Sequence, residues 1–159
     1  MTRDDDINVQ PEGPINWRWK IANDNGSEVI VSFHLNFGSS SDAFAVYQQG
    51  KLNEEQSKIL GQIIMNNLSS VMQVPTNNSV VPVNGHTRHT NLGVLSKFEG
   101  KAGVLIEFGG IASASNRSNI NKNYLNIGYE VARSIYYYVN GRYPDINKES
   151  IVPALRPIN

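Results

Sequence analysis

The segment from Lys101 to Ser113 constrains the fold of this chain more than any other stretch. It contains the apolar run Val104-Leu-Ile106, which is too short for a helix of its own and is rich in branched residues, as buried strands are. The run ends on a carboxylate, Glu107. Gly109-Gly110 follows, where the backbone can turn sharply and leave space for a ligand. Glu107 is therefore either a site residue or a strand-ending glutamate that points into water.

A histidine occupies the same kind of position after an earlier strand. Residues 28–33 contain three β-branched residues in a row and an aromatic neighbour, which favours a buried strand. This strand ends on His34, and small residues follow at 38–41. A lone histidine here can be a hydrogen-bonded structural residue, but two such exits in one sheet can share a ligand crevice. We predict that His34 and Glu107 lie at one edge of the sheet, on adjacent or next-adjacent parallel strands.

Helical periodicity marks two long segments that would cover this sheet. One helix is predicted from Asn53, where Gln56 completes a capping-box pattern, to about residue 72. The other is predicted over 121–139 and is ended by Asn140-Gly141. The apolar face of the first is formed by Ile59, Leu60, Ile63, Ile64, Leu68, Val71 and Met72. That of the second is formed by Tyr124, Ile127, Val131, Ile135 and Tyr138.

The sequence signals for the shorter elements are weaker. A short helix is predicted over 15–25, with Gly26 as its C-terminal left-handed residue, and a strand over 43–48. Residues 73–91 carry prolines and many Asn and Thr positions, so they are predicted to form a loop. His86 and His89 lie in this stretch at i, i+3. Such a pair can hold a metal on a helix, but without a helical pattern we favour exposed loop histidines and leave ligand contact by either one open.

Composition suits one soluble globular domain. The 159 residues include 14 Lys and Arg against 14 Asp and Glu, so no basic patch indicates nucleic acid. No stretch approaches the ~20 apolar residues that span a bilayer, and the acidic N-terminus lacks the apolar core of a signal peptide. The absence of cysteine excludes disulfides and thiolate metal sites. We predict a three-layer α/β domain over 1–143, with a mostly parallel twisted sheet flanked by helices, and a surface tail over 144–159.

Several short motifs, taken in order, resemble one known family, the zinc-dependent N-acetylmuramoyl-L-alanine amidases of cell-wall remodelling and phage lysis. The resemblance spans residues 2 to about 140, and five motifs in the right order are more specific than any one of them. They are Thr2-Arg3 with Asp6, Arg18 with Ala22-Asn23, Ser32-Phe-His34-Leu-Asn36, Leu92-Gly-Val-Leu95, and Val104-Leu-Ile-Glu107-Phe-Gly109 with Ile111.

The resemblance implies a reaction and a set of roles. Such enzymes hold one zinc ion with two His and one Glu, and a second Glu acts as general base. The bond cleaved joins the lactyl group of N-acetylmuramic acid to L-alanine of the stem peptide. By position, His34 would be a zinc ligand and Glu107 the catalytic carboxylate. The resemblance also implies peptidoglycan, a muramyl peptide, as substrate, and a cell-wall, extracytoplasmic or phage-encoded protein.

The sequence departs from the family pattern in two places. The family's first His and its ligand Glu would both lie upstream of Met1, so we expect a quarter to a third of such a domain, including a strand, to be missing. After Glu107, Gly110 stands where an aromatic residue is usual, and Ala112-Ser113 replaces Ser-Asn, which could alter the pocket wall.

Three hypotheses follow. The first is a zinc amidase whose remaining ligands come from a missing N-terminal segment or a partner chain. The second is a non-catalytic amidase-like domain that binds cell-wall peptide or a protein partner. The third is an ordinary α/β domain with a superficial likeness, against which His34 and Glu107 together argue.

Overall fold

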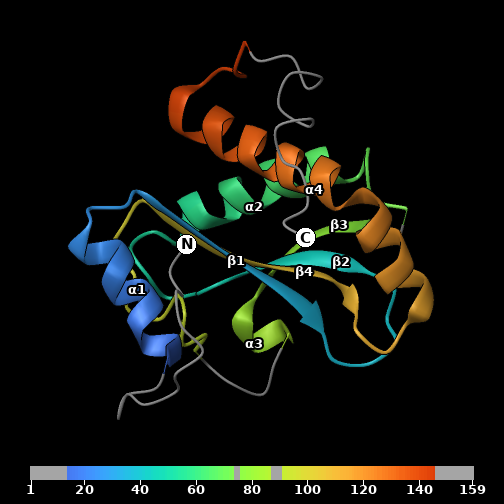
Figure 1. Cartoon of the computed structure of the whole chain (residues 1–159). Helices are drawn as coiled ribbons and strands as arrows, with labels where there is room; N and C mark the ends of the chain where they lie inside the picture. The colour runs from blue at the N-terminus through green and yellow to red at the C-terminus, as the bar shows by residue number, and fades with distance from the viewer. Residues whose placement is uncertain (1–13, 74–75, 87–90, 146–159) are drawn as a thin grey trace.

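The computed structural model describes residues 14–73, 76–86 and 91–145, which form one α/β domain (Figure 1). Four helices and four strands are formed in this part of the chain. In chain order they are α1 (Pro14–Asp24), β1 (Val29–Asn36), β2 (Ala43–Tyr47), α2 (Glu54–Leu68), β3 (Thr76–Pro82), α3 (Val83–His86), β4 (Ala102–Gly110) and α4 (Ala114–Asn140). None of these helices is long and apolar enough to cross a membrane.

The strands form one sheet in the order β1-β4-β2-β3. The pairs β1–β4 and β2–β3 are parallel, whereas β2 runs antiparallel to β4 at the centre. The sheet is therefore mostly parallel, as predicted, with one reversal in the middle. Because of this reversal, the start of β2 lies beside the C-terminal half of β4, and Phe44 is the register partner of Glu107.

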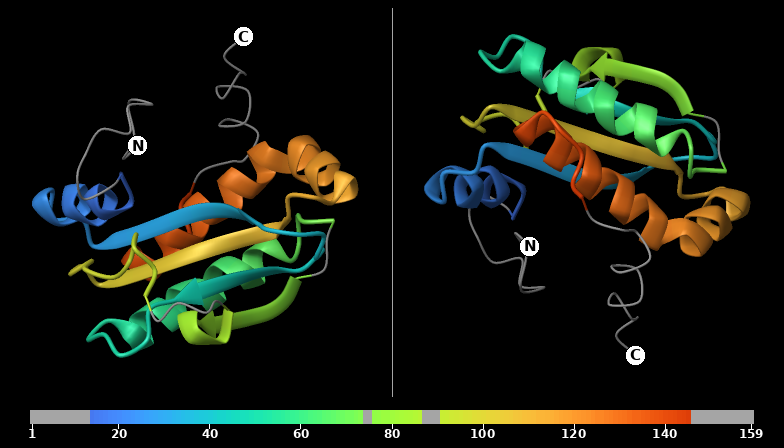
Figure 2. Two further views of the ribbon diagram at one scale, coloured as in Figure 1. Left: turned by 90° about the horizontal axis from the view of Figure 1, so that it is seen from below. Right: turned by 90° about the horizontal axis from the view of Figure 1, so that it is seen from above.

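Helices cover both faces of the sheet, which confirms the predicted three layers. Figure 2 shows α2 and α4 side by side across one face, while α1 and α3 lie on the other. The first face buries Val104 and Ile106 of β4 against Leu60 and Ile64 of α2. The opposite face buries Leu105 in a second cluster. β4 is buried along its whole length because it contributes to both cores.

The predicted loop over 73–91 is wrong for most of its length. Residues 76–82 form β3 beside β2, and residues 83–86 form the single turn α3. Val80 and Val81 pair with β2, and Val83 is fully buried. Pro82 argued against a strand in the sequence. A proline is tolerated here because it is the last residue of a strand that lies at the edge of the described sheet.

The predicted capping box at Asn53 is also wrong. The Asn53 side chain makes no cap bond and donates instead to the carbonyl of Gly100, 2.9 Å away. The Gln56 side chain accepts a hydrogen bond from the Tyr138 hydroxyl, 2.9 Å away. These two side chains therefore connect α2 to distant parts of the chain, and local spacing could not reveal those partners.

Both long helices differ from their predicted ends. α2 ends at Leu68 rather than near residue 72, and the hydroxyls of Ser69 and Ser70 donate back to carbonyls of its last turn. α4 begins at Ala114, seven residues before the predicted start, because Ser113 caps it by accepting from the Asn116 amide. The predicted stop is confirmed, since Gly141 has the left-handed φ of +69°. Nearly all of the predicted tail, 144–159, lies outside the described residues.

The burial of α2 gives a test of the core. Ile64 is fully buried, so Ile64→Ala should lower the free energy of unfolding by about 2 to 5 kcal/mol, measured by denaturant titration. Ile59, predicted to share the apolar face, is 41% exposed, so Ile59→Ala is the matched control and should cost less than about 1 kcal/mol. Equal losses in the two variants would show that this face of α2 is assigned wrongly.

Candidate functional site

His34 and Glu107 lie side by side on adjacent parallel strands. They are register partners in the β1–β4 pair, at the end of an unbroken run of pairs that begins with Val29 and Ala102. Register partners of a parallel pair project from the same face, and neighbouring strands are about 4.8 Å apart. The prediction that these two residues share one edge of the sheet is therefore confirmed. The alternative in which Glu107 points into water is wrong, because the residue is only 6% exposed.

Burial controls the protonation of Glu107. Removing its carboxylate from water raises the pKa from 4.5 to about 7. On the β2 side the register partner is Phe44, a buried aromatic residue, so an apolar group flanks the carboxylate opposite His34. A carboxyl group with a pKa near 7 exists in both protonation states at neutral pH. It can therefore act as base and acid within one reaction.

His34 stands nearer to solvent than Glu107, and its surroundings favour the neutral imidazole. Although its side chain is exposed in part, desolvation by the surrounding protein lowers the pKa of His34. The positive charge of Arg18 on α1 lowers this pKa further. Neutral imidazole is the form that binds metals and accepts protons. Arg18 thus belongs to the electrostatic surroundings of His34, across the face of the sheet that α1 covers.

Two glycines after Glu107 let the strand exits approach each other. Gly109 has a φ of +92°, which a residue with a side chain rarely adopts. A Cβ atom on Gly110 would lie 2.2 Å from the carbonyl oxygen of Gly38 in the loop after β1. The Gly110 amide donates to the carbonyl of Ser40, 2.6 Å away, and the Ala112 amide donates to the carbonyl of Gly38. Backbone hydrogen bonds therefore tie the two strand exits together.

Asn116 is a positioning residue that the sequence did not reveal. It lies in the first turn of α4, is almost fully buried, and donates from its side chain to the Ser40 carbonyl, 2.9 Å away. The Ser40 carbonyl thus accepts from both Asn116 and Gly110. The only sequence signal for this role was Ser113 as an N-cap, which would have placed Asn116 in the first turn.

The two site residues match a zinc site in donor type but do not complete one. Imidazole nitrogen and carboxylate oxygen are common zinc ligands, and a zinc site needs at least three protein ligands. Within residues 14–73, 76–86 and 91–145, no three His, Cys, Asp or Glu side chains are grouped so as to hold a metal. His86 is the last residue of α3, but its side chain is not described, and His89 lies outside the described residues. The structure therefore leaves the open question about these two histidines untested.

An imidazole beside a buried carboxylate at a strand exit of an α/β sheet is an arrangement that a hydrolase can use. The sequence shows the family. The chain belongs to the N-acetylmuramoyl-L-alanine amidase family, whose sequence model matches residues 1–137. It is accordingly a peptidoglycan hydrolase of the type that cleaves the amide bond between N-acetylmuramic acid and L-alanine. No curated protein sequence matches the chain.

Solved amidase structures share this fold. The catalytic domain of CwlV from Bacillus (Paenibacillus) polymyxa var. colistinus is 20% identical, with a TM-score of 0.68 over 89% of this chain and 72% of that one. CwlD from Clostridioides difficile, solved in complex with the GerS lipoprotein, is 22% identical, with a TM-score of 0.70 over 89% and 75%. Ami1 from Mycobacterium smegmatis is 16% identical, with a TM-score of 0.70 over 89% and 67%. At these identities the likeness establishes the fold.

The raised pKa of Glu107 makes stability depend on pH in metal-free protein. The folded chain holds this proton more tightly than the unfolded chain, so the stabilisation is complete below pH ~4.5 and is lost as pH rises through about 7. Glu107→Gln removes the titration. Between pH 4 and pH 8, wild-type protein should lose about 1 to 3 kcal/mol of unfolding free energy relative to the variant, measured by urea titration with a chelator present. Parallel pH profiles would contradict a buried, raised-pKa carboxyl.

The close approach of the strand exits can be tested at Gly110. Gly110→Ala should destabilise the chain by more than ~1 kcal/mol, because its Cβ meets backbone atoms of Gly38 that cannot move freely. Gly128 in α4 has open space around it, so Gly128→Ala is the control and should raise stability by about 0.5 to 1 kcal/mol through helix propensity. Thermal unfolding of both variants measures the difference. An unchanged Gly110→Ala midpoint would show that the loop is not held there.

Proposed function

We propose that the chain hydrolyses the amide bond between N-acetylmuramic acid and L-alanine at a zinc site that includes His34, with Glu107 as the general base. The observation that carries this proposal is the register of β1 and β4, which sets a histidine beside a buried carboxylate on one face of the sheet. The substrate proposed is the muramyl peptide of peptidoglycan. Since that polymer lies outside the cytoplasmic membrane, the site of action would be the cell wall, reached by an extracytoplasmic or phage-encoded protein.

The residues of the chain divide the chemistry between them. When bound, a zinc ion would polarise the scissile carbonyl and make water a stronger nucleophile. His34 would hold the ion through its neutral imidazole. Glu107 would accept the proton of the attacking water and pass it to the leaving nitrogen. The water oxygen bonds to the lactyl carbonyl carbon, the C–N bond breaks, and the products are a lactyl carboxylate and a free alanine amine.

The remaining zinc ligands would come from residues outside the described part of the chain. The sequence offers His89, the acidic segment 4–6 and His86, whose side chain is not described, and a further polypeptide segment is the other source.

Substitutions at His34 and Glu107 test the two proposed roles, zinc ligand and general base, separately. Glu107→Gln should keep one zinc per chain but lower the release of stem peptide from peptidoglycan by at least ~100-fold, because an amide cannot accept the proton of water. His34→Ala should lower both zinc content and turnover, because it removes a ligand. Zinc is measured after dialysis by atomic emission, and peptide release by its new amino groups.

Glu130→Gln is the matched control, since Glu130 is a buried glutamate on α4 that pairs with Arg133. It should leave zinc content and turnover unchanged. Full turnover by Glu107→Gln would end the proposal.

A further inference from the structure

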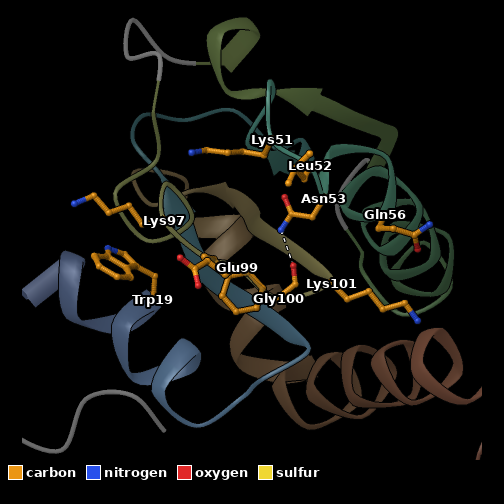
Figure 3. Close-up of a pocket in the computed structure, with 10 residues that line it drawn as sticks. Trp19, Lys51, Leu52, Asn53, Gln56, Lys97, Glu99, Gly100 and Lys101 are labelled. Atoms are coloured by element: carbon orange, nitrogen blue, oxygen red, sulfur yellow. Dashed lines mark hydrogen bonds between the residues drawn. The ribbon is translucent and has the colours of Figure 1, made fainter.

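A pocket of about 650 Å³, whose lining residues Figure 3 shows, lies at the start of β4, whereas Glu107 lies near the end of that strand. It is formed by α1, the loop before α2 and the turn that leads into β4. Lys101 at its margin is six residues from Glu107, which is about 20 Å along β4. The pocket is therefore separate from the amidase site. Its volume falls within the range of about 300 to 1,000 Å³ that is usual for small-molecule sites.

The charges around the pocket favour an anion. Lys51, Lys97 and Lys101 line it, against one carboxylate, Glu99. No ion pair is formed by these three lysines within the described part of the chain, whereas Lys58 on nearby α2 is paired with glutamates. In Figure 3, Lys101 points away toward α4, where its ammonium group lies 5.3 Å from the centre of the Tyr138 ring. Lys51 and Lys97 extend on the side of the pocket away from α4, with the Lys97 ammonium group near the Trp19 ring, and among the described residues they are the two cations placed to meet a ligand.

Aromatic and amide groups complete the lining. The Lys97 ammonium group lies 5.3 Å from the centre of the half-buried Trp19 ring, and Figure 3 shows Lys51 extending toward the same side. The Trp19 indole N–H is buried and has no hydrogen-bond partner among the described residues. The Asn53 amide nitrogen donates to the Gly100 carbonyl, and its amide oxygen has no hydrogen-bond partner among the described residues. The pocket thus combines an aromatic wall, an amide group and two cations.

We propose that this pocket binds an N-acetylated sugar that bears a carboxylate, specifically the muramic acid left in the glycan after the stem peptide is removed. The apolar face of a pyranose ring can pack on Trp19, hydroxyl and acetamido groups can bond to Asn53, and a carboxylate can pair with Lys51 and Lys97. In intact peptidoglycan the lactyl group is a neutral amide. Hydrolysis converts it into a carboxylate, so this pocket selects product glycan over substrate by one charge.

The inference depends on the bond that the family cleaves and not on zinc, His34 or Glu107. Its consequence is that the domain stays bound to a glycan strand from which it has begun to remove peptides. A binding measurement without metal tests it separately from catalysis. Failure of binding would leave the amidase mechanism untouched, and failure of the mechanism would leave the binding result valid.

The test uses N-acetylmuramic acid, its lactyl methyl ester and N-acetylglucosamine as probes. Trp17→Phe leaves Trp19 as the single tryptophan, so its fluorescence reports binding in metal-free protein. N-acetylmuramic acid should bind at least tenfold more tightly than the ester or N-acetylglucosamine. Combined Lys51→Gln and Lys97→Gln should remove this preference, and 0.5 M salt should weaken it, because the selective contact is ionic. Lys122→Gln, an exposed lysine of α4, is the control and should change nothing.

Three results would overturn the inference. One is equal binding of the acid, the ester and N-acetylglucosamine, which would remove the role of the carboxylate. Another is tight binding of the acid that survives loss of both lysines, which would place the ligand elsewhere. The third is glycerol phosphate binding as tightly as N-acetylmuramic acid, which would show that the pocket recognises anions without regard to the sugar.

Discussion

The parallel register of β1 and β4 is the constraint on which the rest of the structure depends. Each strand alternates its side chains between two faces, so a slip of one residue would move His34 out of line with Glu107 and reverse the buried faces. Such a slip is prevented because both faces are occupied. Val31 and Val104 pack toward α2 and α4, while Ile30 and Leu105 pack toward α1. The hydrophobic cores therefore determine where the polar pair stands.

The side-chain packing of β4 is interrupted just beyond Glu107. Beyond Glu107 the strand continues into Gly109 and Gly110, where the space of a Cβ atom is taken by the Asn116 side chain and by the Gly38 backbone, respectively. The same segment is held by the Ser40 carbonyl and Asn116. A buried carboxylate with a raised pKa lowers stability at neutral pH, and the fully buried residues of α2 and β4 offset that cost. The packed core thus tolerates a buried carboxyl group with a raised pKa at this strand exit.

The sequence predicted the architecture and the positions of His34 and Glu107, because apolar runs and small-residue exits are local signals. It did not predict β3, whose polar Asn77-Asn78 and terminal Pro82 resemble a loop until the neighbouring β2 supplies hydrogen bonds. It misassigned Asn53 because that side chain bonds to Gly100, 47 residues away. The role of Asn116 was also hidden, since its partner Ser40 lies 76 residues away in sequence. Partners that are distant in sequence leave no periodic signal.

The central claim is that the register of β1 and β4 creates one metal-binding site. Its most direct test is nitrogen NMR of the His34 imidazole in the protein during addition of zinc. The account predicts that one equivalent of zinc shifts one ring nitrogen of His34 strongly and abolishes its titration between pH 5 and 8, while wild-type and Glu107→Gln proteins behave alike. A His34 ring that still titrates freely while one zinc is tightly bound would contradict it.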